Sequence, residues 1–267
     1  MKKPKILITN DDGINSPGLL ASAEVASEFG DIVITAPYSQ QTAMGRSLKG
    51  DKEARLKPVD YEVYGKKVEA YSCECSPASV IRHSMAVLFQ NEQPDLAISG
   101  INYGENIGAT ITSSGTVGAA LESATYGIPS IAVSKETEID SHHKYTDQDW
   151  SVTKHFLKYF IEKTITRKLP FDVDLLKIDV PENASVSTPW GLTRQARIHH
   201  YSTVFLKPTL GTKLGEGTTI INKNHELLDR NTDIHAISID KIVSVTPISL
   251  DLTSRVDFTE LKNFLKD

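Results

Sequence analysis

The chain has 267 residues, of which 39% are hydrophobic and 24% charged, and its formal net charge is −5. This composition is ordinary for a globular protein and excludes a disordered or collagen-like chain. No stretch approaches the ~20 consecutive apolar residues of a membrane span, and no basic surplus or stripe favours a nucleic-acid partner. The apolar run after the first lysines stops at Thr9, far short of a signal peptide, so we expect a cytoplasmic protein.

Short apolar strands alternate with amphipathic helices along the first 180 residues. The pattern predicts buried strands at 5–9, 31–36, 96–98, 130–134 and 175–180, and helices at 18–29, from Ser76 to about 88, at 115–126 and at 149–164. Residues 52–73 are typical of antiparallel strands around a turn at 64–67. This alternation predicts an α/β fold, with a parallel sheet covered by helices on both faces.

The pattern changes after residue 182. Residues 183–236 are polar and turn-rich with short β runs, residues 237–246 carry strand-like runs, and 258–265 predict a short helix. We expect a catalytic core at 1–182 to which 237–253 returns, a β-rich arm at 183–236, and a C-terminal helix within 254–267. An arm this long is unusual as a simple connection, so we expect it to pair with another subunit in a homodimer or homotetramer.

Two adjacent carboxylates, Asp11 and Asp12, follow the first predicted strand and precede Gly13. Ligands bind at the carboxyl ends of strands in open parallel sheets, and Gly13 lets the backbone turn so that both carboxylates face one site. A divalent cation offsets their repulsion, and oxygen ligands favour Mg²⁺, Mn²⁺ or Ca²⁺ over zinc. The plainer interpretation is a solvated acidic turn that caps the next helix.

A glycine-rich stretch at 100–118 follows the third core strand and ends at Ser114, Gly115 and Thr116, where a helix is expected to begin. Its backbone N–H groups and the helix N-terminus can hold an anion, or its glycines serve only tight turns and close packing. The stretch matches neither the P-loop nor the dinucleotide-binding pattern. A cation site and an anion site at one sheet edge indicate metal-assisted phosphate chemistry.

The chain resembles the SurE family of metal-dependent 5′/3′-nucleotidases in several motifs taken together. The stretches that carry the resemblance are Ile6–Gly13 (ILITNDDG), Ser99–Asn106 (SGINYGEN), Ser114–Ala120 (SGTVGAA) and Gly127–Ser130 (GIPS). The resemblance implies a Rossmann-like core, an extended C-terminal part that builds dimers and tetramers, and hydrolysis of nucleoside monophosphates with a divalent ion. It leaves the choice between 5′ and 3′ substrates open.

The family's metal is held by two aspartates, a serine and an asparagine. By resemblance these correspond to Asp11, Asp12 and Asn102, and alignment on Pro37 places the hydroxyl ligand at Thr42. The resemblance therefore implies one divalent ion, Mg²⁺ or Mn²⁺, in each subunit. The chain departs from the family pattern at Tyr38, Ser79 and Lys177, which bear on substrate preference.

The mechanism expected from these residues is hydrolysis by a water that the metal ion activates. Asp11 orients or deprotonates this water, Asp12 is mainly a ligand, and Asn106 joins Ser114, Gly115 and Thr116 in holding the phosphate. Two alternatives remain open at this point: a metal-dependent glycosyl- or nucleotidyl-transferase, and a non-catalytic module that senses a nucleotide or phosphate.

Overall fold

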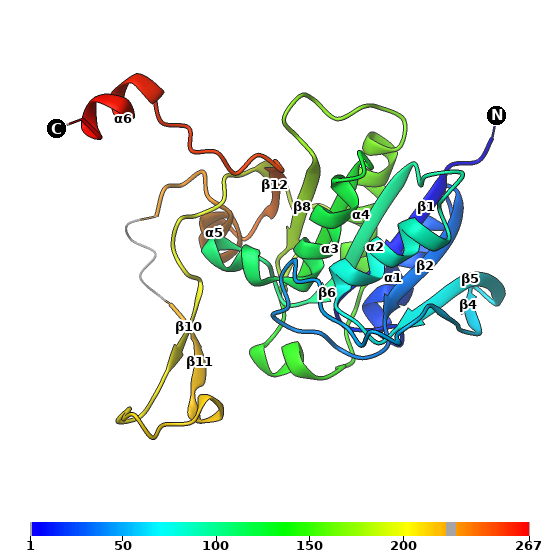
Figure 1. Cartoon of the computed structure of the whole chain (residues 1–267), viewed down its shortest axis with the longest axis horizontal. Coiled ribbons are helices and arrows are strands. Elements are labelled where there is room, and N and C mark those ends of the chain that lie inside the picture. Colours follow the sequence, from blue (N-terminus) through cyan, green and yellow to red (C-terminus); the bar gives the residue numbers. More distant parts are fainter. Residues whose placement is uncertain (1, 223–227, 267) are drawn as a thin grey trace.

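A mostly parallel sheet forms the centre of the computed structural model, which describes residues 2–222 and 228–266 (Figure 1). The main sheet has the order β3-β5-β2-β1-β6-β7-β8-β12-β9, with β4 also paired to β5. Its strands are β1 (Lys5–Thr9), β2 (Asp31–Pro37), β3 (Lys57–Pro58), β4 (Tyr61–Val63), β5 (Lys66–Cys73), β6 (Leu96–Tyr103), β7 (Ser130–Lys135), β8 (Leu175–Val180), β9 (Trp190–Leu192) and β12 (Val243–Ile248).

The six strands from β5 to β8 run parallel to one another, in the order β5-β2-β1-β6-β7-β8. Because the chain winds outward in both directions from β1, the strand order reverses between β1 and β6. This is the Rossmann arrangement, in which the crevice at the reversal point is where ligands bind. The predicted α/β fold is therefore confirmed, and Asp11 and Asn102 follow or end the two strands that flank this crevice.

Helices cover both faces of the sheet. Successive residues of a strand point to opposite faces, so neighbouring residues of β1 pack against different helices. Ile6 and Ile8 pack in one cluster with residues of α1 (Pro17–Ala26) and α4 (Ser151–Thr164). Leu7 packs in another with Ile81 of α2 (Pro77–Val87) and Ala119 of α3 (Gly115–Ala124). Short helical turns complete the described structure at η1 (Gly108–Ser113), η2 (Ile139–His143), η3 (Leu214–Glu216), α5 (Asp233–His235) and η4 (Ala236–Asp240), besides the terminal α6 (Phe258–Phe264).

The first two helices differ from the sequence prediction in their ends. Helix α1 stops at Ala26 rather than near residue 29, and Gly30 lies so close to the carbonyl of Pro4 that a Cβ would sit 2.2 Å from its oxygen. Gly30 thus permits a close backbone contact and is not the helix stop. At α2, the hydroxyl of Ser76 donates to the carbonyl of Ser47 at 2.5 Å instead of capping the helix.

The prediction of strand-like runs over residues 237–246 is wrong for the first half of that range. Residues Ala236–Asp240 form a turn of π-helix, which ends at Lys241 in the left-handed conformation with φ +52°. Ile237 is buried there in a cluster with Ile107, Ala196 and Ile234, so apolar packing rather than strand pairing explains its hydrophobicity. The strand begins later, and β12 pairs antiparallel with β8.

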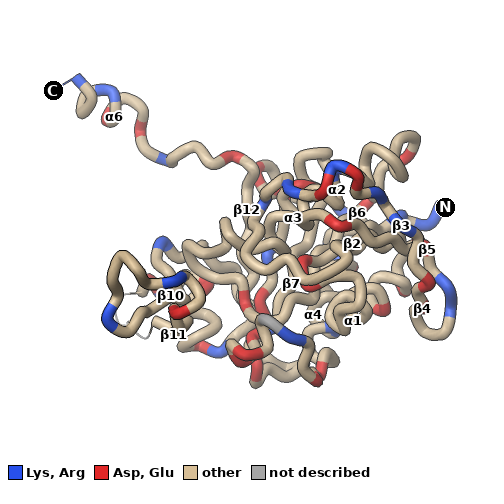
Figure 2. The backbone as a smooth tube through the Cα atoms, turned by 60° about the horizontal axis from the view of Figure 1, so that its bottom comes forward, with Lys and Arg blue, Asp and Glu red and all other residues tan. Residues whose placement is uncertain are grey.

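Residues 183–236 are only partly separate from the sheet. Strand β9 pairs with β12, whereas β10 (Tyr201–Val204) and β11 (Thr218–Ile221) form an antiparallel hairpin that extends away from the body (Figures 1 and 2). Helix α6 also lies apart, at the end of a long extended segment. Residues 223–227 of the expected arm lie outside the described residues, and no helix within the described ranges is long and apolar enough to cross a membrane.

Candidate active site

A tight turn directly after β1 holds the two aspartates. The side chain of Asn10 donates to the carbonyl of Gly13 and accepts its N–H, both at 3.1 Å. Gly13 has φ +103°, and a Cβ at this residue would lie 3.1 Å from the backbone of Ser39. Glycine is therefore required at this position both by conformation and by space, and the turn leaves Asp11 and Asp12 buried at the crevice between β1 and β6.

Asp11 faces the beginning of α3. The hydroxyl of Thr116 donates to Oδ1 of Asp11 at 2.5 Å, and a Cβ on Gly115 would lie 2.5 Å from the Cβ of Asp11, so only glycine lets the helix approach so closely. Burial raises the pKa of Asp11 to about 6, although hydrogen bonds from the Thr116 side chain and from the backbone of Gly115 and Thr116 lower it. Asp11 is thus a buried carboxylate that titrates near neutral pH.

Asp12 faces the loops after β2 and β6. Its Oδ1 accepts from the amide of Gln40 at 3.1 Å and its Oδ2 from the N–H of Tyr103 at 3.4 Å, while its carbonyl accepts the hydroxyl of Tyr145 at 2.7 Å. Burial, and then the negative charge of Asp11, raise the pKa of Asp12 well above its usual range. The two carboxylates therefore share one site and repel each other.

The donor set at this site fits a hard divalent cation. Neither aspartate has a lysine or arginine partner among residues 2–222 and 228–266, so their charge is uncompensated by the protein. Asn102 donates its amide N–H groups to the carbonyls of Tyr103 and Gly104, at 3.1 and 2.7 Å, which leaves its Oδ1 as the acceptor. An ion would then be held by carboxylate and neutral oxygens, a combination suited to Mg²⁺ or Mn²⁺.

Thr42 is the remaining residue of the expected ligand set. It lies in the loop after β2, which contacts both aspartates through neighbouring residues. The N–H of Gln41 donates to the carbonyl of Asp11 at 2.7 Å, and Thr42 follows as an exposed residue. No cluster of three or more His, Cys, Asp or Glu side chains able to hold a metal occurs within the described part of the chain. A metal at this site therefore needs neutral oxygens beyond the two carboxylates.

The residues expected to hold phosphate lie in two places. Ser114 is the N-cap of α3, where its hydroxyl accepts from the N–H of Val117 at 3.2 Å, and Gly115 and Thr116 form the first turn of the helix beside Asp11. The hydroxyl of Thr116 and the backbone of Gly115 and Thr116 hydrogen-bond Asp11, so this first turn is engaged by the carboxylate. Asn106 instead donates its amide to the hydroxyl of Ser134 on β7 at 2.8 Å.

Several residues around the site were not anticipated from the sequence. Gln40, Tyr103 and Tyr145 contact Asp12 directly, and Tyr103 packs edge-on against Trp150 at a ring-centroid distance of 5.0 Å. Gln40 lies two residues before Thr42, and this closeness to a predicted ligand was the only sequence signal that could have pointed to Gln40. Tyr145 belongs to the segment between β7 and α4, which carries no motif.

A second unanticipated group joins the hairpin to the loop after β6. The buried Glu105 accepts from the hydroxyl of Tyr201, at the start of β10, and its Oε1 lies 3.1 Å from Nε2 of His200. Hydrogen bonds from His200 and Tyr201 hold the pKa of Glu105 below its usual value despite its burial, which acts in the opposite direction. The projecting hairpin is thus anchored beside the candidate site.

Comparisons with known proteins agree with this geometry. A family model described as "Survival protein SurE" matches residues 6–202. A protein of Thermococcus gammatolerans named 5′-nucleotidase SurE is 39% identical, over 98% of this chain and 96% of its own length. One of the same name from Thermococcus kodakarensis is 37% identical, over 98% of both chains. The crystal structure of a SurE protein from Aquifex aeolicus has a TM-score of 0.78 at 27% identity, covering 99% of this chain and 100% of that one. On fold, motifs and full-length similarity, this chain belongs to the SurE family.

Proposed function

We propose that this protein hydrolyses nucleoside 5′-monophosphates to nucleoside and phosphate, with the help of one divalent metal ion in each subunit. The observation that carries the proposal is the pair of buried carboxylates, Asp11 and Asp12, which lie without a cationic partner among the described residues at the switch point of the sheet and beside the N-terminus of α3. The curated relatives named 5′-nucleotidase SurE support the same activity.

Asp11, Asp12 and Asn102 would hold the ion, with Thr42 as a further ligand, and Mg²⁺ or Mn²⁺ suits this oxygen set. Such an ion offsets the negative charge of a phosphate group and lowers the pKa of water. A phosphate ester suits a site with a cation on one side and a helix N-terminus on the other, and the names of the relatives support a nucleoside 5′-monophosphate as that ester.

The protein's own groups account for proton transfer and orientation. Asp11 orients the attacking water or takes its proton, because its carboxylate is buried at the site and has a fixed position there. Thr116 holds this carboxylate in place through its hydroxyl. The positive end of the α3 dipole and the amide of Asn106 would orient the phosphate.

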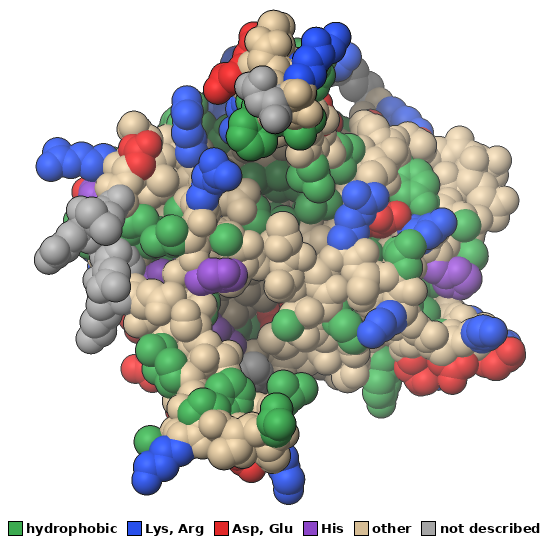
Figure 3. All heavy atoms as spheres, turned by 60° about the vertical axis from the view of Figure 1, so that its left-hand side comes forward, with side chains coloured by type: hydrophobic (Ala, Val, Ile, Leu, Met, Phe, Trp, Pro, Cys, Tyr) green, Lys and Arg blue, Asp and Glu red, His purple; other side chains and the backbone are tan. Residues whose placement is uncertain are grey.

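The same proposal includes a homodimer or homotetramer. The hairpin and the segment between its strands expose Leu206, Leu210 and Leu214, each more than nine-tenths accessible, and α6 exposes Phe258, Phe264 and Leu265. Hydrophobic side chains gather on the hairpin, which protrudes at the bottom of Figure 3. Apolar surface on projecting elements is typical of surfaces that subunits bury on assembly.

Phosphate release from 5′-AMP and 3′-AMP tests the activity, measured with Mg²⁺, with Mn²⁺ and with a chelator. We expect release from 5′-AMP that depends on the added ion and is lost in Asp11→Asn. Tight binding of 5′-AMP without any phosphate release would instead support the non-catalytic alternative. A product that retains the phosphate on an acceptor molecule would support a transferase.

A further inference from the structure

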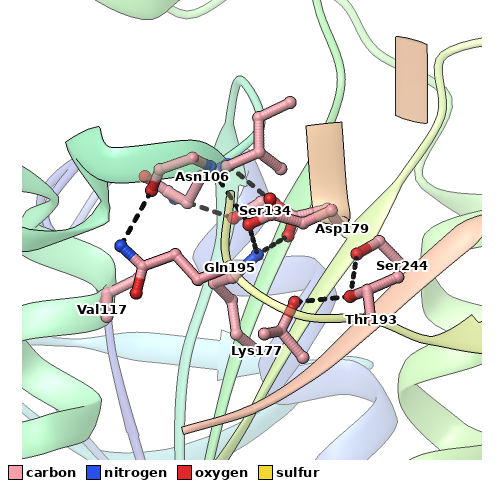
Figure 4. A network of polar contacts seen from close by, with 12 residues as sticks. Asn106, Val117, Ser134, Lys177, Asp179, Thr193, Gln195 and Ser244 are labelled. Atoms are coloured by element: carbon pink, nitrogen blue, oxygen red, sulfur yellow. Dashed lines mark hydrogen bonds and ion pairs between the residues drawn. The ribbon is translucent and has the colours of Figure 1, made fainter. Parts of the chain in front are cut away.

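Three charged side chains lie completely buried next to the loop after β6. Nζ of Lys177, on β8, is 2.6 Å from Oδ2 of Asp179 and 3.3 Å from Oδ2 of Asp233, and all three side chains are inaccessible (Figure 4). Charged residues are almost never fully buried unless they are paired. The network therefore has a specific role in this fold, and the proposed hydrolysis does not use it directly.

The two carboxylates of this network hold the backbone of residues 106–108. Oδ1 of Asp179 accepts the N–H of Asn106 at 2.7 Å, and Oδ2 of Asp233 accepts the N–H of Gly108 at 3.1 Å. The carbonyl of Gly108 also accepts from the amide of Gln195 at 3.2 Å. Two buried anions thus fix both ends of the tripeptide that contains Asn106.

The side chain of Asn106 is fixed from a different direction. Its amide donates to the hydroxyl of Ser134, on β7, at 2.8 Å. Figure 4 shows Asn106 and Ser134 above the Lys177–Asp179 pair, with Gln195 reaching toward the same loop. With the backbone held by Asp179 and the side chain by Ser134, the orientation of Asn106 depends on the strands beneath it.

Lys177 provides a positive charge between the two buried carboxylates. Burial lowers the pKa of Lys177, but the charges of Asp179 and Asp233 outweigh it, so that the pKa is raised overall. Burial raises the pKa of Asp179 to about 6, against the opposing charge of Lys177. The lysine thus lies between two carboxylates, which without it would repel each other in a region of low dielectric constant.

We infer that Lys177 is a positioning residue for the active site: its ion pairs with Asp179 and Asp233 keep both carboxylates where they hold residues 106–108, and so orient Asn106 toward the phosphate. The inference rests on the proposed function, because Asn106 acts on substrate only if the site binds a phosphate ester.

Two variants test whether Lys177 acts through its charge or only through its contribution to the fold. Lys177→Asn leaves two buried carboxylates unpaired, whereas the double variant Lys177→Asn/Asp179→Asn keeps the net buried charge of the native network and retains an oxygen that can accept the N–H of Asn106. Groups that orient active-site residues commonly contribute about 10–100-fold, so we expect the single variant to lose about tenfold or more in kcat/KM for 5′-AMP. We expect the double variant to recover most of that loss.

A cycle with Asn106→Ala tests whether Lys177 acts through Asn106. If it does, adding Lys177→Asn to Asn106→Ala costs little more than Asn106→Ala alone, because coupled residues are not additive. Ser244→Ala is the control, since its buried hydroxyl contacts Thr193 at 2.9 Å in the same region and takes no part in the hydrogen bonds that hold residues 106–108. We expect it to keep native kcat/KM. Fully additive losses in the cycle, or a double variant no better than Lys177→Asn, would overturn the inference.

Amide hydrogen exchange gives a readout that does not depend on activity. In Lys177→Asn the amides of Asn106 and Gly108 should exchange at least about tenfold faster, while those of β1 keep their protection. Unchanged exchange at both amides would overturn the inference even if activity fell. Faster exchange in a protein whose native form releases no phosphate would support the loop-holding role of Lys177 and overturn the proposed hydrolysis.

Discussion

The hydroxyl of Thr116 lies 2.5 Å from Oδ1 of Asp11, and this contact joins the first turn of α3 to the end of β1. The two residues are 105 positions apart in the sequence. The contact fixes the carboxylate that we propose as the proton acceptor, and it lowers the pKa of Asp11 against the effect of burial. Thr116 therefore acts on the carboxylate through its side chain, whereas the sequence had suggested a contact with phosphate.

Thr116→Val removes this hydrogen bond at nearly constant volume. Since the lost donor stabilised the ionised carboxylate, the pKa of Asp11 rises and the acid limb of kcat/KM moves to higher pH. We expect a loss of about 10–100-fold at neutral pH. A pH profile of 5′-AMP hydrolysis measures both effects, and Thr116→Ser, which keeps the hydroxyl, should resemble the native protein. An acid limb that stays in place in Thr116→Val would show that the contact does not tune Asp11.

Asp11→Asn is expected to abolish hydrolysis and to stabilise the metal-free protein at neutral pH. The pKa of Asp11 is raised to about 6 in the folded state, so the native protein loses stability as the pH rises from about 4 to about 6, and the penalty persists above that range. A shift of about two pKa units corresponds to at most about 3 kcal/mol. Asparagine does not titrate and escapes this penalty.

Unfolding by urea in the presence of a chelator, at pH 4 and pH 7, checks the direction of this change in stability. The variant and the native protein should have similar stability at pH 4, and the variant should be more stable at pH 7. Added Mn²⁺ should then stabilise the native protein but not Asp11→Asn. A variant that is less stable than the native protein at pH 7 without metal would contradict the assigned burial and repulsion of the carboxylates.

The alternation of strands and helices was enough to predict the parallel sheet. Ile6, Leu7 and Ile8 form a short apolar run with polar turn formers after it, and the resulting strand ends where Asp11 and Asp12 begin. Local patterns of this kind reflect burial on both faces of a strand. The prediction failed at 237–240, because Ile237 is buried by helical packing and a short apolar run does not distinguish the two cases.

Contacts between distant residues could not be predicted in the same way. Asp233 holds the N–H of Gly108 across a separation of 125 residues, and Tyr145 reaches Asp12 from a segment without a motif. A partial signal existed for the buried network, since Lys177 and Asp179 interrupt an otherwise apolar strand. Charges in such a strand indicate a buried pair, but their partner in α5 follows only from the fold.

The metal ligand in the loop after β2 can be assigned by comparing Thr42 with Ser39. Thr42→Ala should raise the metal concentration for half-activity by about 10–100-fold, whereas Thr42→Ser should be tolerated. Ser39→Ala should be nearly silent, because Ser39 lines a hollow of about 260 Å³ on the side of Cys73 and Cys75. A metal titration of the three variants decides the assignment, and a larger loss in Ser39→Ala would move the ligand to Ser39.

The exposed leucines of the hairpin segment should support assembly. Replacing Leu206, Leu210 and Leu214 by serine removes apolar surface that is almost fully accessible in the single chain, so we expect the native oligomer to dissociate. Light scattering at micromolar concentration measures the mass, and Phe171→Ser, at an equally exposed residue outside the hairpin, is the control. A native protein that is already monomeric would contradict the proposed assembly.

Hydrolysis, as we propose it, depends on a divalent ion that the Asp11–Asp12 pair binds. Titration calorimetry with Mn²⁺, and phosphate release from 5′-AMP over the same range of Mn²⁺ concentrations, test it on one preparation. We expect one ion per subunit, a dissociation constant that matches the Mn²⁺ concentration for half-activity, and the loss of both binding and activity in Asp12→Asn. Full activity in excess chelator, or an Asp12→Asn variant that hydrolyses 5′-AMP at the native rate, would contradict it.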